Sequence, residues 1–126
     1  MLFRSDKPGV AANVSQLYAE TFGKNNTGPA VAELLLNRIG YEHLQNGDKK
    51  GAIAILKLNA SLYPNSPNVY DSLGDAYLAD GQSDLARQNA EKAIELLAHD
   101  TTDPEARRKG IRDSAEQKLK QLNAPH

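Results

Sequence analysis

Hydrophobic residues recur every three or four positions along most of the chain, and glycine or proline interrupts this pattern between stretches. Such spacing places the apolar side chains on one face of an α-helix. The sequence therefore predicts an all-α protein. We expect helices over about 8–23, 29–46, 49–63, 67–80, 84–97 and 104–122.

Turn and capping residues mark the ends of the central helices. Gly47 and Gly81 follow polar residues at points where a left-handed turn would end a helix. Asp48, Ser66 and Ser83 can each cap the helix that follows. These signals predict two helical hairpins, one before and one after the proline-rich turn at residues 63–67.

The first and last predicted helices differ from the central four. The stretch 8–23 carries one apolar stripe, formed by Val10, Val14, Leu17, Tyr18 and Phe22. In the stretch 104–122 the hydrophobic residues thin to Ile111, Ala115, Leu119 and Leu122, and the remaining positions are charged or polar. One apolar and one polar side are what a helix needs to cap the end of a stacked array.

One pattern occurs twice at a spacing of 34 residues. A fixed period of this size is typical of repeat proteins, in which stacked units share a continuous core. Small residues within the pattern let two helices approach closely, while larger ones fill the space between them. The first copy is Leu36, Ile39, Gly40, His43, Gly47, Ala52 and Leu56, and the second is Tyr70, Leu73, Gly74, Tyr77, Gly81, Ala86 and Ala90.

These residues resemble the tetratricopeptide repeat, a 34-residue helical hairpin. The stretch Tyr70–Tyr77 (YDSLGDAY) is similar to its first helix, with repeats expected at 33–66 and 67–100. The resemblance implies a single domain: a right-handed superhelix fragment of a leading helix, two hairpins and a capping helix. Departures from the family pattern stand at His43, Asn59, Ala90 and Ala98.

A second and looser resemblance covers about residues 38–82. The stretch Tyr63–Tyr77 (YPNSPNVYDSLGDAY) is similar to the C-terminal repeats appended to some bacterial serine hydrolases, namely esterases and β-lactamase-related enzymes. The context it implies is an accessory domain downstream of a catalytic one. No catalytic residue of those enzymes can be placed in this chain.

Composition removes several classes of function. The 15 basic and 16 acidic side chains nearly balance, and the net charge of -1 gives no general attraction to nucleic acid or an anionic membrane. The absence of cysteine excludes disulfides and thiol chemistry but leaves the compartment open. No apolar run suits a transmembrane helix or a signal peptide, so we expect a soluble chain, cytoplasmic unless it is part of an exported hydrolase.

The sequence lacks the common catalytic and metal-binding motifs. The sequence has no Gly-x-Ser-x-Gly, Ser-x-x-Lys or phosphate-binding glycine motif, so we expect no enzymatic activity in this chain. Its three histidines, His43, His99 and His126, lack the spacing of a zinc site. We expect no cofactor and no metal, and we expect His43 to be a packing residue.

The residues most suited to binding a partner lie on the first helix of each predicted repeat. In a superhelix this face lines a concave groove, and charged residues of the last helix continue the row. Two aspartates one turn apart repel each other, so a cation from a partner would suit them. The candidates, all expected to be exposed, are Asn37, Tyr41, Asp71, Asp75, Glu105 and Lys109.

The predicted function is a non-enzymatic module that binds a protein or peptide in a short groove. The first alternative is the accessory domain of a serine hydrolase, and the second is a homo-oligomerisation unit such as a homodimer. The basic cluster at residues 107–112 is interpreted as a solvated surface rather than a nucleic-acid site.

Overall fold

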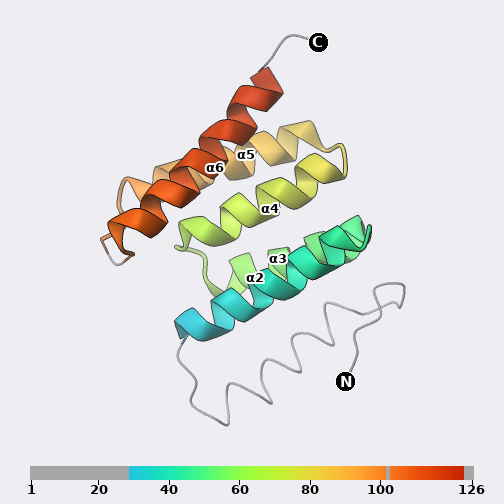
Figure 1. The fold of residues 1–126 in the computed structure, drawn as a ribbon, viewed down its shortest axis with the longest axis horizontal. Helices are drawn as coiled ribbons and strands as arrows, with labels where there is room; N and C mark the ends of the chain where they lie inside the picture. The colour runs from blue at the N-terminus through green and yellow to red at the C-terminus, as the bar shows by residue number, and fades with distance from the viewer. Residues whose placement is uncertain (1–28, 102, 124–126) are drawn as a thin grey trace. The chain divides into compact units, whose positions relative to one another are not determined.

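The computed structural model describes residues 29–101 and 103–123, and this part of the chain is helical throughout apart from its connections. The all-α prediction is confirmed for these residues. The helix expected over 8–23 lies outside them. Figure 1 shows the helices α2 (Pro29–Gln45), α3 (Lys49–Leu62), α4 (Pro67–Ala79), α5 (Ser83–Leu97) and α6 (Glu105–Asn123).

The chain divides into two compact units, residues 1–63 and 64–126. In the first unit α2 packs on α3, and in the second α5 packs on both α4 and α6. The helix α6 also contacts α4. Both predicted hairpins are therefore confirmed, and α6 covers the second hairpin as expected of a capping helix. The superhelix that would relate the two units stays a prediction.

The first hairpin is held by a small core between its helices. Leu36 and Ile55 form its centre, and Ile39, Leu58 and Tyr63 pack against them. A further close contact joins Gly40 of α2 to Leu56 of α3: a Cβ atom at residue 40 would lie only 2.5 Å from Leu56 Cδ2. The repeat glycine at this position is needed because Leu56 is fully buried.

The turn between α2 and α3 is built around Asp48. Gly47 has a φ of 84°, and Asp48 Oδ1 accepts a hydrogen bond of 3.0 Å from the backbone nitrogen of Gly51. The other carboxylate oxygen lies 2.9 Å from His43 Nδ1. The predicted cap is confirmed, and His43 is buried as expected, but its role also includes this polar contact.

Asn59 accounts for one of the departures from the repeat pattern. Its side chain is fully buried on α3, and its Nδ2 atom donates a hydrogen bond of 3.0 Å to the carbonyl oxygen of Glu33 on α2. A backbone carbonyl oxygen has two lone pairs, so it can accept a hydrogen bond from a side chain in addition to one from the backbone of its own helix. An amide here therefore ties the two helices together where the family pattern has alanine.

The second unit packs three helices around small residues. Ala90 and Ala93 of α5 contact Ala115 of α6, and Tyr70, Ile94 and Leu119 pack around them. The turn before α5 follows the prediction at Gly81, which has a φ of 78°. The prediction that Ser83 caps α5 is wrong: Ser83 is its first residue, and Gln82 occupies the capping position without a side-chain hydrogen bond. Ser66 holds the capping position of α4, also without such a bond.

Candidate functional site

The most connected polar cluster of the second unit joins α4 to α6. Asp71 and Asp75 lie one turn apart on α4, and Lys118 of α6 forms an ion pair with both. The Lys118 Nζ atom is 2.7 Å from Asp71 Oδ1 and 2.8 Å from Asp75 Oδ1. The same nitrogen donates a hydrogen bond of 2.9 Å to Ser114 Oγ. All three donors of the ammonium group therefore have an acceptor.

This cluster is largely removed from solvent. Lys118 is 3% exposed and Asp71 is 6% exposed, whereas the side chain of Asp75 keeps 30% of its surface. The expectation that Asp71 is an exposed groove residue is wrong, because α6 packs over this face of α4. The cation that the aspartate pair was expected to take from a partner comes from the chain itself.

Gly74 makes room for the lysine. It follows Asp71 by one turn on α4 and directly precedes Asp75. A Cβ atom built there would lie 3.2 Å from Lys118 Cε and 3.5 Å from the carbonyl oxygen of Ala86. The methylene stem of Lys118 therefore runs against the bare backbone of α4. The repeat glycine serves the capping helix here, whereas Gly40 serves the partner helix of its own hairpin.

The environment of Asp71 shifts its titration. Burial raises the pKa of the Asp71 carboxyl above its ordinary value of 3.8, and repulsion from Asp75 acts in the same direction. The ion pair with Lys118 and hydrogen bonding with Lys118 and Ser114 oppose the shift without overcoming it. Desolvation of the carboxylate is thus the dominant effect at this site.

The raised pKa of Asp71 predicts how its charge affects stability. The folded state binds this proton more tightly than the unfolded state, so the Asp71 contribution to stability falls as the pH rises from 3.8 through the raised value. Asp71→Asn cannot titrate. We therefore expect the free energy of unfolding of the native chain, minus that of Asp71→Asn, to decrease over this interval in urea titrations.

A matched variant separates this effect from the general loss of a carboxylate. Glu116 is exposed on α6, and Glu116→Gln removes an acidic group outside the cluster. A native-minus-Asp71→Asn difference that increases with pH, or that follows the Glu116→Gln difference, would contradict the prediction.

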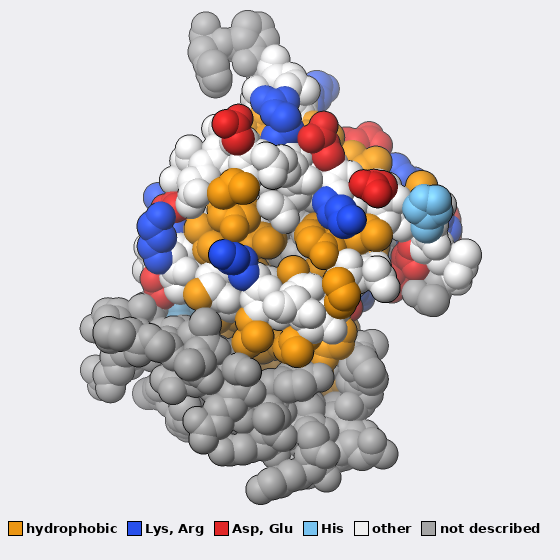
Figure 2. All heavy atoms as spheres, turned by 180° about the vertical axis from the view of Figure 1, so that it is seen from behind, with side chains coloured by type: hydrophobic (Ala, Val, Ile, Leu, Met, Phe, Trp, Pro, Cys, Tyr) orange, Lys and Arg blue, Asp and Glu red, His pale blue; other side chains and the backbone are white. Residues whose placement is uncertain are grey.

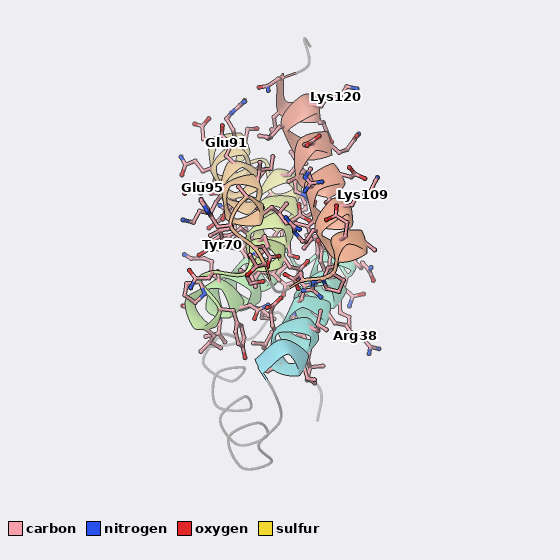
Figure 3. All side chains as sticks on the ribbon, turned by 90° about the vertical axis from the view of Figure 1, so that its left-hand side faces the viewer. Arg38, Tyr70, Glu91, Glu95, Lys109 and Lys120 are labelled. Atoms are coloured by element: carbon pink, nitrogen blue, oxygen red, sulfur yellow. The ribbon has the colours of Figure 1, made fainter. Side chains whose placement is uncertain are left out.

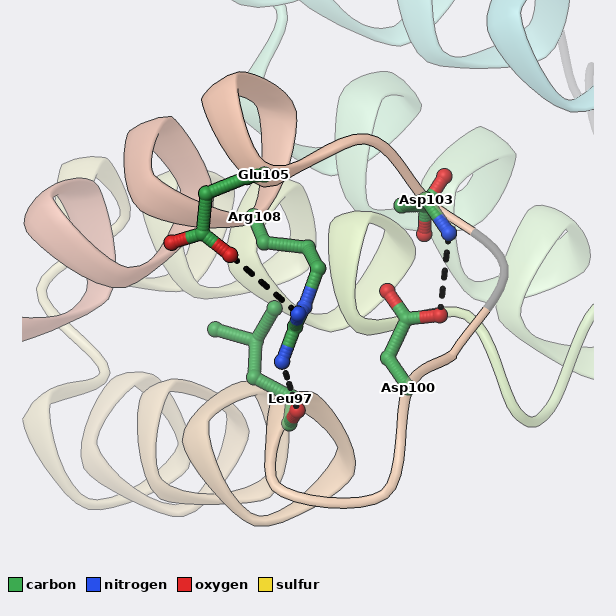
Figure 4. A network of polar contacts seen from close by, with 5 residues as sticks. All are labelled: Leu97, Asp100, Asp103, Glu105 and Arg108. Atoms are coloured by element: carbon green, nitrogen blue, oxygen red, sulfur yellow. Dashed lines mark hydrogen bonds and ion pairs between the residues drawn. The ribbon is translucent and has the colours of Figure 1, made fainter.

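The two candidates on α6 lie at its surface, each with a charge partner on the same helix. Glu105 accepts a contact of 3.3 Å from Arg108, which also donates to the carbonyl oxygen of Leu97 and so fastens the start of α6 to the end of α5 (Figure 4). Lys109 is 2.7 Å from Asp113 and extends from α6 at the surface (Figure 3). The hydrogen bond with Asp113 raises the pKa of Lys109.

The basic cluster at residues 107–112 is balanced in the same way. Besides the Arg108 contacts, Arg107 is 3.1 Å from Asp103, whose backbone nitrogen donates to Asp100 Oδ1 at 3.3 Å (Figure 4). Both contacts involve Asp103, which lies just before α6. The charges of Arg107, Arg108 and Lys109 are thus paired with acidic groups of the second unit.

The remaining candidates, Asn37 and Tyr41, lie on α2 in the first unit. Both are half-buried, and Leu34, one turn before Asn37, is 46% exposed. Residues spaced i, i+3 and i+7 share one side of a helix. The three side chains therefore form a row along α2, which we call the α2 row. The ion pair between Arg38 and Glu42 lies beside it at the surface, with Arg38 extending from the helix in Figure 3.

Neither a metal site nor a membrane-spanning helix emerges from the described part of the chain. No group of three or more histidine, cysteine, aspartate or glutamate side chains converges among residues 29–101 and 103–123. None of the five helices is both long and apolar enough to cross a bilayer.

The comparison with protein families bears on the second hairpin. Residues 67–96, which comprise α4 and nearly all of α5, match the model of the tetratricopeptide repeat. The chain contains a tetratricopeptide repeat. A comparison with curated proteins found no match. Tetratricopeptide repeats generally mediate protein–protein interaction and are typically non-enzymatic. The resemblance to repeats of serine hydrolases stays a prediction.

Within this repeat, sequence reasoning located the two aspartates but missed the residue that binds them. The missed signal was the position of Lys118 in α6. It follows Ile111 by seven residues and Ala115 by three, so it lies on the apolar side of the helix. A lysine on a face that must be buried needs an acidic partner, and the aspartate pair was the available one.

Proposed function

We propose that this chain is a non-enzymatic protein-interaction module and that the α2 row, formed by Leu34, Asn37 and Tyr41, is its recognition surface. The observation that carries the proposal comes from the second repeat. There the two positions 34 residues further on, Asp71 and Asp75, bind a side chain from a neighbouring helix. The repeat thus uses this pair of positions to hold a side chain that inserts against its first helix.

The chemistry of the α2 row favours an uncharged ligand. Asp71 and Asp75 suit a lysine, but the equivalent Asn37 and Tyr41 carry no charge and offer hydrogen-bonding groups beside an aromatic ring. Leu34 adds an exposed apolar contact one turn away. A peptide or partner surface presenting a polar uncharged side chain next to an aliphatic one fits this row.

Removal of the α2 row should abolish peptide binding without unfolding the chain. Peptides selected from a random display library against the native chain would be measured by fluorescence anisotropy against Asn37→Ala/Tyr41→Ala. We expect affinity to fall by about tenfold or more, because truncating contact residues at the centre of an interface removes most of its energy. Circular dichroism would confirm that the variant retains its helices.

Glu91→Ala/Glu95→Ala provides the matched control. Both glutamates are exposed on α5 and lie together at one edge of the second unit (Figure 3). This variant should bind the selected peptides as the native chain does. Equal binding by the α2-row variant, or selection of no peptide at all, would remove the proposal.

A further inference from the structure

The large hydrophobic side chains that remain exposed in the described part of the chain all lie on the first hairpin. They are Val31, Leu34 and Leu35 of α2 and Leu62 of α3, with exposed fractions between 39% and 55%. Figure 2 shows hydrophobic side chains reaching the surface between charged ones on one side of the molecule. Val31 and Leu35 are one turn apart, so they share a side of α2.

This side of the hairpin continues its core. Ile39, the next turn after Leu35, packs on the Leu36–Ile55 core together with Leu58. Leu62 follows Leu58 by one turn on α3. We call the exposed part, Val31, Leu35 and Leu62, the stacking face. Two helices alone cannot bury it, and in the second unit α6 supplies the third helix that contacts both members of the hairpin.

The second copy of the repeat shows what becomes of these positions. The residues 34 positions after Val31 and Leu34 are Asn65 and Asn68, which are polar, and the one after Leu35 is Val69, which is fully buried. At the positions of Val31 and Leu35 the second copy thus has a polar or a fully buried residue, and at that of Leu62 it has the half-buried Leu96. That difference indicates that the stacking face is covered in the folded protein.

We propose that residues 8–23 of this same chain form an amphipathic helix that docks on the stacking face. These residues lie outside the described part of the structure and are separated from α2 by residues 24–28 only. Their stripe of Val10, Val14, Leu17, Tyr18 and Phe22 has helical spacing. The helix would be about 24 Å long beside an α2 of about 25 Å, at 1.5 Å per residue.

The connection between this segment and α2 supports the docking. Residues 24–28 are polar and include a glycine, and connections this short join neighbouring antiparallel helices. An antiparallel arrangement brings the large side chains of Tyr18 and Phe22 to the first turns of α2, where Val31 and Leu35 are exposed. Val31 and Leu35 lie on a different side of α2 from Asn37 and Tyr41. The docking proposal therefore does not depend on whether the α2 row binds a ligand.

Hydrogen exchange of the full chain, without any added peptide, tests the docking. We expect amides of residues 8–23 to be protected, and Leu35→Ser to lower this protection about tenfold or more while α4 and α5 keep theirs. Phe22→Ser should have the same effect from the other side of the contact. Leu44→Ser is the matched control, because Leu44 is a half-buried residue on the opposite side of α2.

A second measurement identifies the chain that supplies the helix. The protein has no cysteine, so Phe22→Cys/Val31→Cys introduces a single pair. A disulfide within one chain supports the proposal. Disulfide-linked dimers would overturn it in favour of a second copy. Unprotected amides over 8–23, or protection that Leu35→Ser and Leu44→Ser lower equally, would overturn it as well.

Discussion

Replacing Lys118 with methionine is expected to lower the free energy of unfolding by about 3–5 kcal/mol. The variant keeps the volume of the side chain against Gly74 but leaves Asp71 and Asp75 facing each other without their cation. Asp71 is already disfavoured as a carboxylate by burial. Removing the one charge that opposes this effect leaves an uncompensated buried charge, which is far more costly than losing a surface ion pair.

Two further variants identify the cause of this loss. Lys120→Met removes an exposed lysine two residues later on α6 (Figure 3) and should change stability by less than about 0.5 kcal/mol. Lys118→Met combined with Asp71→Asn and Asp75→Asn should regain most of the lost stability, since no charge is then buried. Urea unfolding at neutral pH measures all three. Equal effects of Lys118→Met and Lys120→Met would show that the buried contact contributes nothing.

The second large effect is expected where α2 meets α3. Gly40→Ala should cost about 1–3 kcal/mol, because its Cβ atom would lie 2.6 Å from Cγ of Leu56, which is fully buried and would have to shift. Leu56→Ala alone should cost about 2–5 kcal/mol through the cavity that it leaves.

The double variant distinguishes steric conflict from a general intolerance of α2 to substitution. In Gly40→Ala/Leu56→Ala the new methyl group occupies part of the cavity, so the combined loss in thermal or urea unfolding should be smaller than the sum of the two single losses. Strict additivity would mean that the two residues are not in contact.

The local features of the fold could be predicted because they depend on residues close together in the sequence. Gly47 and Gly81 adopt the left-handed conformation that their place after a polar residue indicated. Asp48 caps α3 through the hydrogen bond expected of an aspartate at that position. Ser83 was misassigned because a serine can precede or begin a helix, and only the backbone conformation decides between the two.

The candidate site was predicted only in part. Asp71 and Asp75 were identified as a pair that needs a cation, but their exposure was inferred from a groove left open to solvent. The sequence separation between Asp75 and Lys118 carries no local signal of contact. The one sequence signal for Lys118 is that this charged residue lies on the apolar face of its predicted helix.

By itself, the sequence determined the helices, the hairpins and the repeat, since hydrophobic spacing, turn glycines and a 34-residue period are properties of the chain alone. Tertiary structure decided what each repeated position does. The same glycine admits Leu56 in the first copy and the stem of Lys118 in the second. Whether a position is exposed or buried depends on which helix packs against it. Burial and ion pairing therefore arise only when segments that are distant in the sequence come into contact.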